Sequence, residues 1–402
     1  MTPIQRLHLV KSTLSDAQVQ PLANNLIKMR DLKQVYMSHN NLSNNALGML
    51  ADAIAVNVKI EEISMTHNDL SLPNGVKIIR ALKNMTGLKK LSLNSCTLDQ
   101  ELLQELVNSL AANESLTDLN LYSNEINSEG AQMIAQLLAN KVNLRTLGLS
   151  NNYIGQSGAR EIAAVCQDAL FGLVRLSLES NLIGNLGLIG LSKAMIDNES
   201  LEELYLYNNE IDDDSIDAFT EMLDNKRKLR ILGLEYNKIR NKAEHVMRAI
   251  QNKPIFERLY LTQNMIQPSI GEATFELLTT SFSIRELRMN HNHQMGDEAG
   301  KRIAEGLLQS KSLKVCHLSD TRMGNQSAML MAEVIRKGNM RDLDISNNLI
   351  IMDDIEILAN AFKESQIECL NLRGNIVSAE EIVVFEHLLA PVCTMTKRKF
   401  IF

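Results

Sequence analysis

The sequence of 402 residues lacks several features that mark other classes of protein. It has no tryptophan and only five cysteines, at positions 96, 166, 316, 369 and 393, without a CxxC pair. An odd number of dispersed cysteines does not make a disulfide framework. We therefore expect a reducing compartment and a cytoplasmic protein.

Long apolar runs and a strong excess of one charge are also missing. No stretch approaches the roughly 18 apolar residues of a membrane-spanning helix, and Met1 to Val10 lacks the apolar core of a signal peptide. The 41 basic and 48 acidic side chains give a net charge of only −7, whereas nucleic-acid and polybasic membrane binding rest on clustered lysine and arginine. We expect a soluble protein that binds neither nucleic acid nor membranes.

An internal repeat runs through almost the whole chain. The string Leu-x-x-Leu-x-Leu-x-x-Asn-x-Leu occurs in fourteen copies spaced 27 to 29 residues apart. Of the 56 apolar places in these copies 55 hold an apolar residue, and only Gln294 departs. The ninth place is asparagine in eleven copies. The copies begin at Ile4, Leu32, Ile60, Leu88, Leu116, Leu144, Leu173, Leu201, Leu229, Phe256, Ile284, Leu313, Met340 and Ile367.

Each copy predicts a short strand followed by a helix. In the fifth copy Leu119 and Leu121 alternate inward, and the amide of Asn124 can bond backbone groups where the chain turns. Helical spacing follows, as in the apolar positions from Ala131 to Leu138. Strands stack about 4.8 Å apart but helix axes need about 8 to 10 Å, so the stack must bend with its strands inside.

This pattern resembles the leucine-rich repeat family, and the repeat length with its helical half resembles the ribonuclease-inhibitor-like subclass. The resemblance covers nearly the whole chain. It implies an α/β solenoid, a right-handed horseshoe of about 14 repeats with a concave parallel β-sheet and convex helices. We expect one leucine-rich repeat domain over residues 1–393 and a C-terminal tail over 394–402.

The ends of this domain are candidate docking points. The first strand has no dedicated cap beyond Met1 to Pro3, and a bare strand edge exposes backbone donors and acceptors. The tail ends in Phe400, Ile401 and Phe402, which are too few to form a core of their own. We therefore predict docking at the N-terminal edge and at the tail.

The outward-pointing places of the repeat predict a protein-binding surface on the concave face. All seven tyrosines fall in these places, and tyrosine is enriched at interface hot spots, although strands favour aromatic residues in any case. Residues of both charges accompany them. The predicted protein-binding residues are Tyr205, Tyr207, Tyr236, Tyr260, Tyr122, Glu203, Glu235, Arg258 and Arg288.

Other polar groups are better explained without a bound ion. His39 and His67 hold the same place in adjacent copies, but a zinc site needs further ligands, so solvent-facing side chains are expected. The run Asp212 to Asp214 precedes a helix and fits helix capping better than calcium binding. The basic residues from Lys226 to Arg230 predict either a solvated rim or a site for an acidic partner. No metal, cofactor or catalytic residue is predicted.

These observations favour a non-enzymatic protein-protein interaction scaffold that is a subunit of a larger intracellular assembly. Ribonuclease-inhibitor-like repeats, which this sequence resembles, occur in nuclease inhibitors, in innate immune receptors, and in ciliary and cytoskeletal complexes. Cilium and cytoskeleton are therefore candidate locations. A nuclease inhibitor is disfavoured, because those proteins are rich in cysteine and this chain has only five cysteines. The alternative is a GTPase-activating regulator resembling the Ran GTPase-activating protein.

Overall fold

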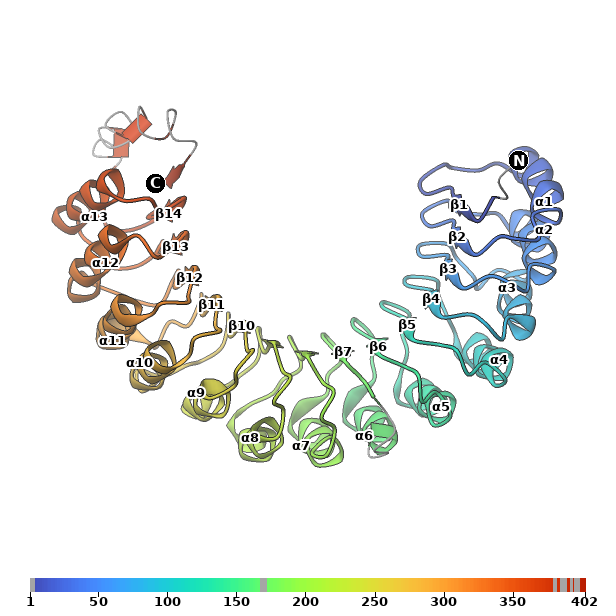
Figure 1. Ribbon diagram of the computed structural model, residues 1–402, viewed down its shortest axis with the longest axis horizontal. Coiled ribbons are helices and arrows are strands. Elements are labelled where there is room, and N and C mark those ends of the chain that lie inside the picture. Colours follow the sequence, from blue (N-terminus) through green and yellow to red (C-terminus); the bar gives the residue numbers. More distant parts are fainter. Residues whose placement is uncertain (1–3, 167–171, 379–381, 384–388, 391–392, 394–397) are drawn as a thin grey trace. The chain divides into compact units, whose positions relative to one another are not determined.

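The computed structural model describes residues 4–166, 172–378, 382–383, 389–390, 393 and 398–402. The chain forms two compact units, Met1–Leu201 and Glu202–Phe402, and each is described by itself. In each unit short strands alternate with helices, as the repeat predicts. The strands line the inner side of each curved unit and the helices its outer side (Figure 1).

Unit 1 contains a parallel sheet in which neighbouring strands follow one another in the chain. Its strands are β1 (Arg6–His8), β2 (Gln34–Tyr36), β3 (Glu62–Ser64), β4 (Lys90–Ser92), β5 (Asp118–Asn120), β6 (Thr146–Gly148) and β7 (Arg175–Ser177). Its helices are α1 (Asp16–Leu26), α2 (Asn44–Ala55), α3 (Gly75–Ala81), η1 (Leu82–Asn84), α4 (Gln100–Leu110), α5 (Ser128–Leu138), α6 (Gly155–Cys166) and α7 (Gly184–Ala194).

Unit 2 repeats this arrangement. Its strands are β8 (Glu203–Tyr205), β9 (Ile231–Gly233), β10 (Arg258–Tyr260), β11 (Glu286–Arg288), β12 (Val315–His317), β13 (Asp342–Asp344), β14 (Cys369–Asn371) and β15 (Lys399–Ile401). Its helices are η2 (Asp213–Ser215), α8 (Ile216–Asp224), α9 (Ala243–Gln251), α10 (Ile270–Thr280), α11 (Gly296–Gln309), α12 (Asn325–Lys337) and α13 (Met352–Glu364).

The register of the strands follows the repeat. Each strand from β1 to β14 occupies the third to fifth places of its copy, and equivalent places pair, as Leu119 does with Leu147. The middle residue points into the core, where both of these leucines are fully buried. The third and fifth places therefore face the inner side of the curve. Together, the parallel strands and the helices that follow them confirm the predicted α/β fold class.

The asparagine column satisfies the turn after each strand. Asn124 donates through Nδ2 to the carbonyl oxygens of Leu121 at 3.0 Å and Leu93 at 2.8 Å. Its Oδ1 accepts the backbone N–H of Cys96 in the preceding repeat at 2.9 Å. Thr321, which stands in the same place, still donates to the Leu318 carbonyl at 2.8 Å. The predicted structural role of this column is confirmed.

Replacing Asn124 by alanine is expected to lower the free energy of unfolding by about 1 to 3 kcal/mol, because buried backbone groups lose their partners. Asn140, an exposed residue outside the column, provides the control, and its replacement by alanine is expected to change stability little. Urea unfolding of both variants measures the difference. If the two variants unfold at the same urea concentration, Asn124 does not have the proposed structural role.

A second column of buried polar side chains joins the ends of some helices to the repeat that follows. Lys141 is only 1% exposed, and its Nζ donates to the carbonyl of Leu110 at the end of α4 at 2.9 Å. Lys253 does the same for the Leu223 carbonyl in α8 at 2.6 Å. Lys226 holds the equivalent place and is buried, so the expectation that it lies on a basic rim is wrong. A lysine stem can pass through apolar surroundings when its ammonium reaches carbonyl groups at a helix end.

The first repeat is poorly covered. Ile4 is 54% exposed although it occupies an apolar place of the repeat. Among the residues that the structure describes, β1 pairs only with β2. Met1 to Pro3 lie outside the described residues, so docking at this edge stays a prediction.

Part of the expected tail packs on the last repeat. Residues Lys399–Ile401 form β15, which pairs with β14, and Phe400 lies opposite Leu370. The Phe400 ring meets the ring of Phe362 in α13 at 5.2 Å. The placement of these residues outside the repeats therefore differs from the structure. The apolar Phe400 between Lys399 and Ile401 serves as the middle residue of a further strand, while residues 394–397 lie outside the described part.

No helix in the part of the chain that the structure describes is long and apolar enough to cross a membrane.

Candidate protein-binding site

The inner face of unit 2 brings most of the predicted binding residues into two neighbouring groups. The first, here called the tyrosine–glutamate cluster, consists of Glu203, Tyr205, Tyr207, Glu235 and Tyr236 on β8 and β9 and the turns that follow. The second, the arginine–glutamate cluster, consists of Arg258, Tyr260, Glu286 and Arg288 on β10 and β11.

In the tyrosine–glutamate cluster aromatic rings lie beside carboxylates. The rings of Tyr207 and Tyr236 meet edge to face, with centroids 5.4 Å apart. The hydroxyl of Tyr205 donates to Glu203 at 2.9 Å. Tyr207 and Tyr236 are 37% and 51% exposed, so the turns after β8 and β9 present both rings to solvent. Such rings carry interface area at little entropic cost.

The backbone after β9 explains how Tyr236 reaches this position. Tyr236 has φ of 54°, in the left-handed region that non-glycine residues seldom adopt. The equivalent place has a positive φ in every copy, as at Asn208 before it and Gln263 after it. The turn that the asparagine column holds therefore fixes the rim on which this ring stands.

The arginine–glutamate cluster is organised by a residue that the sequence analysis did not single out. Glu286 accepts the Tyr260 hydroxyl at 3.3 Å and pairs with Arg288 at 2.5 Å and with Arg258 at 3.7 Å. The guanidinium of Arg288 also lies 5.7 Å from the centre of the Tyr260 ring. Because Glu286 holds the third place of the next copy, strand register could have identified it.

Burial, together with the negative charge of Glu286, raises the pKa of Tyr260 above its ordinary value. The hydroxyl therefore stays protonated at neutral pH and donates to the carboxylate. This bond fixes the ring, and the guanidinium of Arg288 lies against it within cation–π range.

Beside these clusters the rim of unit 2 has a hollow of about 430 Å³. Tyr236, Lys238, Met265, His291 and His293 contribute to its lining. The hollow is mixed in chemistry, since an aromatic ring, a thioether, an ammonium and imidazoles surround it.

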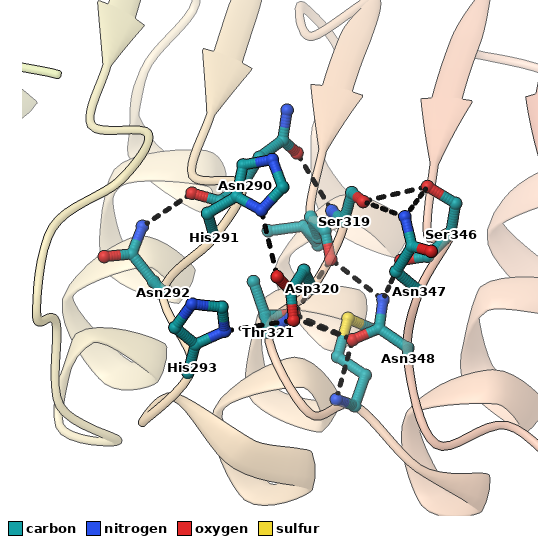
Figure 2. A network of polar contacts seen from close by, with 12 residues as sticks. Asn290, His291, Asn292, His293, Ser319, Asp320, Thr321, Ser346, Asn347 and Asn348 are labelled. Atoms are coloured by element: carbon teal, nitrogen blue, oxygen red, sulfur yellow. Dashed lines mark hydrogen bonds and ion pairs between the residues drawn. The ribbon is translucent and has the colours of Figure 1, made fainter. Parts of the chain in front are cut away.

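Figure 2 shows the polar network that holds the two histidines at this rim. Both donate through Nδ1 to one carboxylate, His291 to Asp320 Oδ2 and His293 to Asp320 Oδ1, each at 3.0 Å. Farther along, Asn290 accepts the backbone N–H of Ser319 at 2.9 Å. These bonds join adjacent repeats and fix the rim.

Asp320→Asn is expected to lower the free energy of unfolding by about 1 to 2 kcal/mol at pH 7, because charge-assisted hydrogen bonds are lost. Burial opposes ionisation of Asp320, but the bonds from His291 and His293 outweigh it and lower its pKa. A carboxylate with a lowered folded-state pKa stabilises the protein above its ordinary pKa. This contribution disappears as the pH falls through the lowered value.

Urea unfolding at a series of pH values measures this effect, with Asp52→Asn on the exposed side of α2 as the control. The difference between wild type and Asp320→Asn should shrink in acid. A difference that is absent at pH 7, or that grows as the pH falls below the ordinary aspartate pKa, contradicts the assigned role.

The remaining candidates lie elsewhere or have structural roles. Tyr122 is in unit 1, in the turn after β5, and is exposed. The rings of His39 and His67 stack with centroids 4.1 Å apart, as adjacent copies predict. No group of three or more His, Cys, Asp or Glu among the described residues could hold a metal ion. The Asp212 side chain accepts the backbone N–H of Asp214 at 2.9 Å at the start of η2, which confirms the expected helix capping. Asp213 instead accepts the backbone N–H of Arg240 in the next repeat at 2.7 Å.

Comparisons with known proteins agree with the fold. A sequence profile described as Leucine Rich repeat matches residues 112–135 and 280–304, and a second, described as Leucine Rich Repeat, matches 200–222. The ribonuclease inhibitor of Mus musculus is 26% identical over 197 residues, covering 46% of this chain and 43% of that protein. The matched region thus spans less than half the length of this relative.

Solved structures resemble the chain at 18% identity, which shows the fold alone. A leucine-rich repeat protein from Leptospira interrogans has a TM-score of 0.54, covering 96% of this chain and 88% of its own. An internalin from Listeria monocytogenes has a TM-score of 0.53, covering 85% of this chain and 92% of its own. A chain of the yeast Rad7 and Elc1 complex has a TM-score of 0.51, covering 92% of this chain and 86% of its own.

Strand–helix repeats joined by an asparagine column define a leucine-rich repeat protein. Within that class, the helical outer half of each repeat and the similarity to a ribonuclease inhibitor place the chain in the ribonuclease-inhibitor-like kind. Leucine-rich repeat proteins act as protein-interaction scaffolds.

Proposed function

We propose that this protein is a non-enzymatic scaffold that binds a partner protein through the inner face of unit 2, as a subunit of a larger assembly. The observation that carries this proposal is the tyrosine–glutamate cluster, where the rings of Tyr207 and Tyr236 are exposed and pack edge to face on the turns after β8 and β9. Partly exposed rings bordered by charges of both signs have the composition of an interface core and its rim. Tyr122 in unit 1 and the N-terminal edge at β1 are proposed as further contacts.

Affinity capture followed by mass spectrometry tests this proposal. Three baits are compared: the wild-type protein, the Tyr205→Ala, Tyr207→Ala, Tyr260→Ala triple variant, and a Tyr153→Ala control that truncates another exposed tyrosine. Partners of the inner face are expected with the wild type and the control but not with the triple variant. If all three baits retain the same proteins, this face is not the binding site.

The same capture tests the proposed location. Ciliary or cytoskeletal components among the proteins lost from the triple variant would support an assembly of that kind, which the family resemblance suggests. The alternative, a GTPase-activating regulator, stays a prediction that no observation in the described residues favours. Measuring GTP hydrolysis by small GTPases with and without the protein distinguishes it, since such a regulator accelerates hydrolysis by orders of magnitude.

A further inference from the structure

The turns that lead from helices α8 to α11 into strands β9 to β12 form a second surface of unit 2. These four turns are residues 225–230, 252–257, 281–285 and 310–314. They hold eight basic residues and one acidic residue, whereas the whole chain has more acidic than basic side chains. The surface, here called the basic turn surface, consists of Arg227, Ile255, Phe282, Arg285, Lys311 and Lys314.

An exposed aromatic ring stands on the third of these turns. Phe282 is 75% exposed, more than any other large apolar residue that the structure describes. Its turn is bonded to the turns on both sides, since the Ser283 hydroxyl donates to the Lys253 carbonyl and the Ser312 hydroxyl donates to the Ser281 carbonyl, each at 3.2 Å. A ring on a turn that is fixed in this way offers apolar contact area at a low cost in conformational entropy.

The cations of this surface have no carboxylate partner. Arg285 donates through Nη1 to the carbonyl of Ser312 at 2.9 Å, and Lys314 donates through Nζ to that of Asn339 at 2.9 Å. Backbone carbonyls are neutral, so these bonds fix both side chains without cancelling their charge. In the described part of the chain no ion pair forms at Arg227, Arg285, Lys311 or Lys314.

The single carboxylate of the four turns is already paired. Glu257 accepts hydrogen bonds from Arg230 Nη2 at 3.0 Å. Asp224, the last residue of α8, precedes the first turn and is the next acidic side chain. A positive excess therefore remains beside two exposed apolar residues, Phe282 and Ile255, of which the second is 42% exposed. Such a surface is complementary to an acidic segment that carries an apolar side chain.

We propose that the basic turn surface binds an acidic segment of a partner protein. An apolar side chain of that segment packs against Phe282 and Ile255, and its carboxylates pair with Arg285, Lys311 and Lys314. This contact is separate from the inner face and needs none of its tyrosines. A protein segment suits the surface better than an anionic membrane, because a bilayer would repel the net charge of −7 on the chain, whereas a segment touches only the turns.

A tryptophan reporter in the full chain tests the proposal, because the sequence has no tryptophan. Phe282→Trp places a single indole on the basic turn surface, and its fluorescence is followed as a peptide is added. The probe is the acetylated and amidated peptide Glu-Asp-Leu-Asp-Glu-Phe-Asp-Glu, and the comparison peptide has Gln and Asn in place of Glu and Asp. The acidic probe is expected to bind about tenfold more tightly and to lose most of this preference at about 1 M salt.

Variants of the reporter protein locate the effect. Lys311→Gln is expected to weaken the acidic probe by about threefold or more, and Arg285→Gln should do the same if either substitution disturbs the fold. Lys77→Gln, which removes an exposed lysine from α3 in unit 1, is the matched control and should bind as the reporter protein does. A second reporter, Met329→Trp on the exposed side of α12, should not respond to the probe.

Equal affinity for the two peptides, an unaffected Lys311→Gln variant, or an equal response of the Met329→Trp reporter overturns the proposal. Vesicles of phosphatidylcholine with and without phosphatidylserine test the membrane. Binding to the phosphatidylserine vesicles without a preference for the acidic peptide assigns the surface to a membrane and overturns the proposal. Sedimentation tests a second copy in the same way, since self-association that Lys311→Gln abolishes, again without this preference, assigns the surface to a dimer.

Discussion

Deleting residues 394–402 should lower the stability of unit 2 by about 3 kcal/mol or more, because the deletion removes a strand and a large aromatic contact. Arg398 donates to the carbonyls of Phe362 and Ser365 at 3.0 and 2.7 Å, where α13 ends. Its guanidinium lies 4.5 Å from the centre of the Phe362 ring, which is fully buried. Without these residues the helix end and this ring lose their cover.

The loss should be local because repeats in a solenoid contact chiefly their neighbours. Hydrogen exchange is expected to speed up most in α13 and β14 and little in unit 1. Phe400→Ala should reproduce much of the effect, about 2 kcal/mol, and Lys399→Ala at an exposed position of the same strand should not. If the shortened chain unfolds at the same urea concentration and exchanges as wild type does, β15 does not stabilise unit 2, and the tail becomes a candidate docking segment again.

The second large effect is expected in partner binding. Truncating Tyr205 or Tyr260 to alanine should weaken a captured partner by about 2 kcal/mol or more, roughly thirtyfold, if each ring is a hot spot. The cost to folding should be smaller, because the leucines that follow each strand build the core. Calorimetric titration measures the affinity, and urea unfolding of the same samples separates binding from stability.

The Tyr153→Ala variant controls for loss of an exposed tyrosine as such and should bind the partner as wild type does. Unchanged affinity in both the Tyr205 and Tyr260 variants would move the contact away from β8 and β10. Equal loss in all three variants would indicate a general effect on the protein and not a site.

The periodicity of the sequence predicts most of the fold, because each buried place of the repeat takes a characteristic type of residue. Leu119 and Leu147 are buried where their spacing requires it, and Asn124 makes the bonds expected at the turn. In contrast, the repeat template does not predict β15, because this strand carries a single inward residue, Phe400, and no asparagine. Burial of Lys226 also escapes prediction, because only the folded helix end presents the carbonyls that lysines of this column reach.

The candidate site was predictable as a surface but not as an arrangement. The outward places identify Tyr207 and Tyr236, whereas their edge-to-face contact depends on the left-handed backbone at residue 236. The role of Glu286 depends on strand register, and that of Asp320 on two histidine rotamers. Such contacts follow from side-chain conformations that the pattern of residue types leaves free.

The most direct test of an inner-face binding site is hydrogen exchange of the protein with and without its captured partner. Binding at the proposed site should slow exchange in the segments from β8 to β11 and the turns that follow them, while α8 to α11 on the outer side exchange as in the free protein. Protection confined to those helices, with unchanged exchange in the strands and turns, would contradict it.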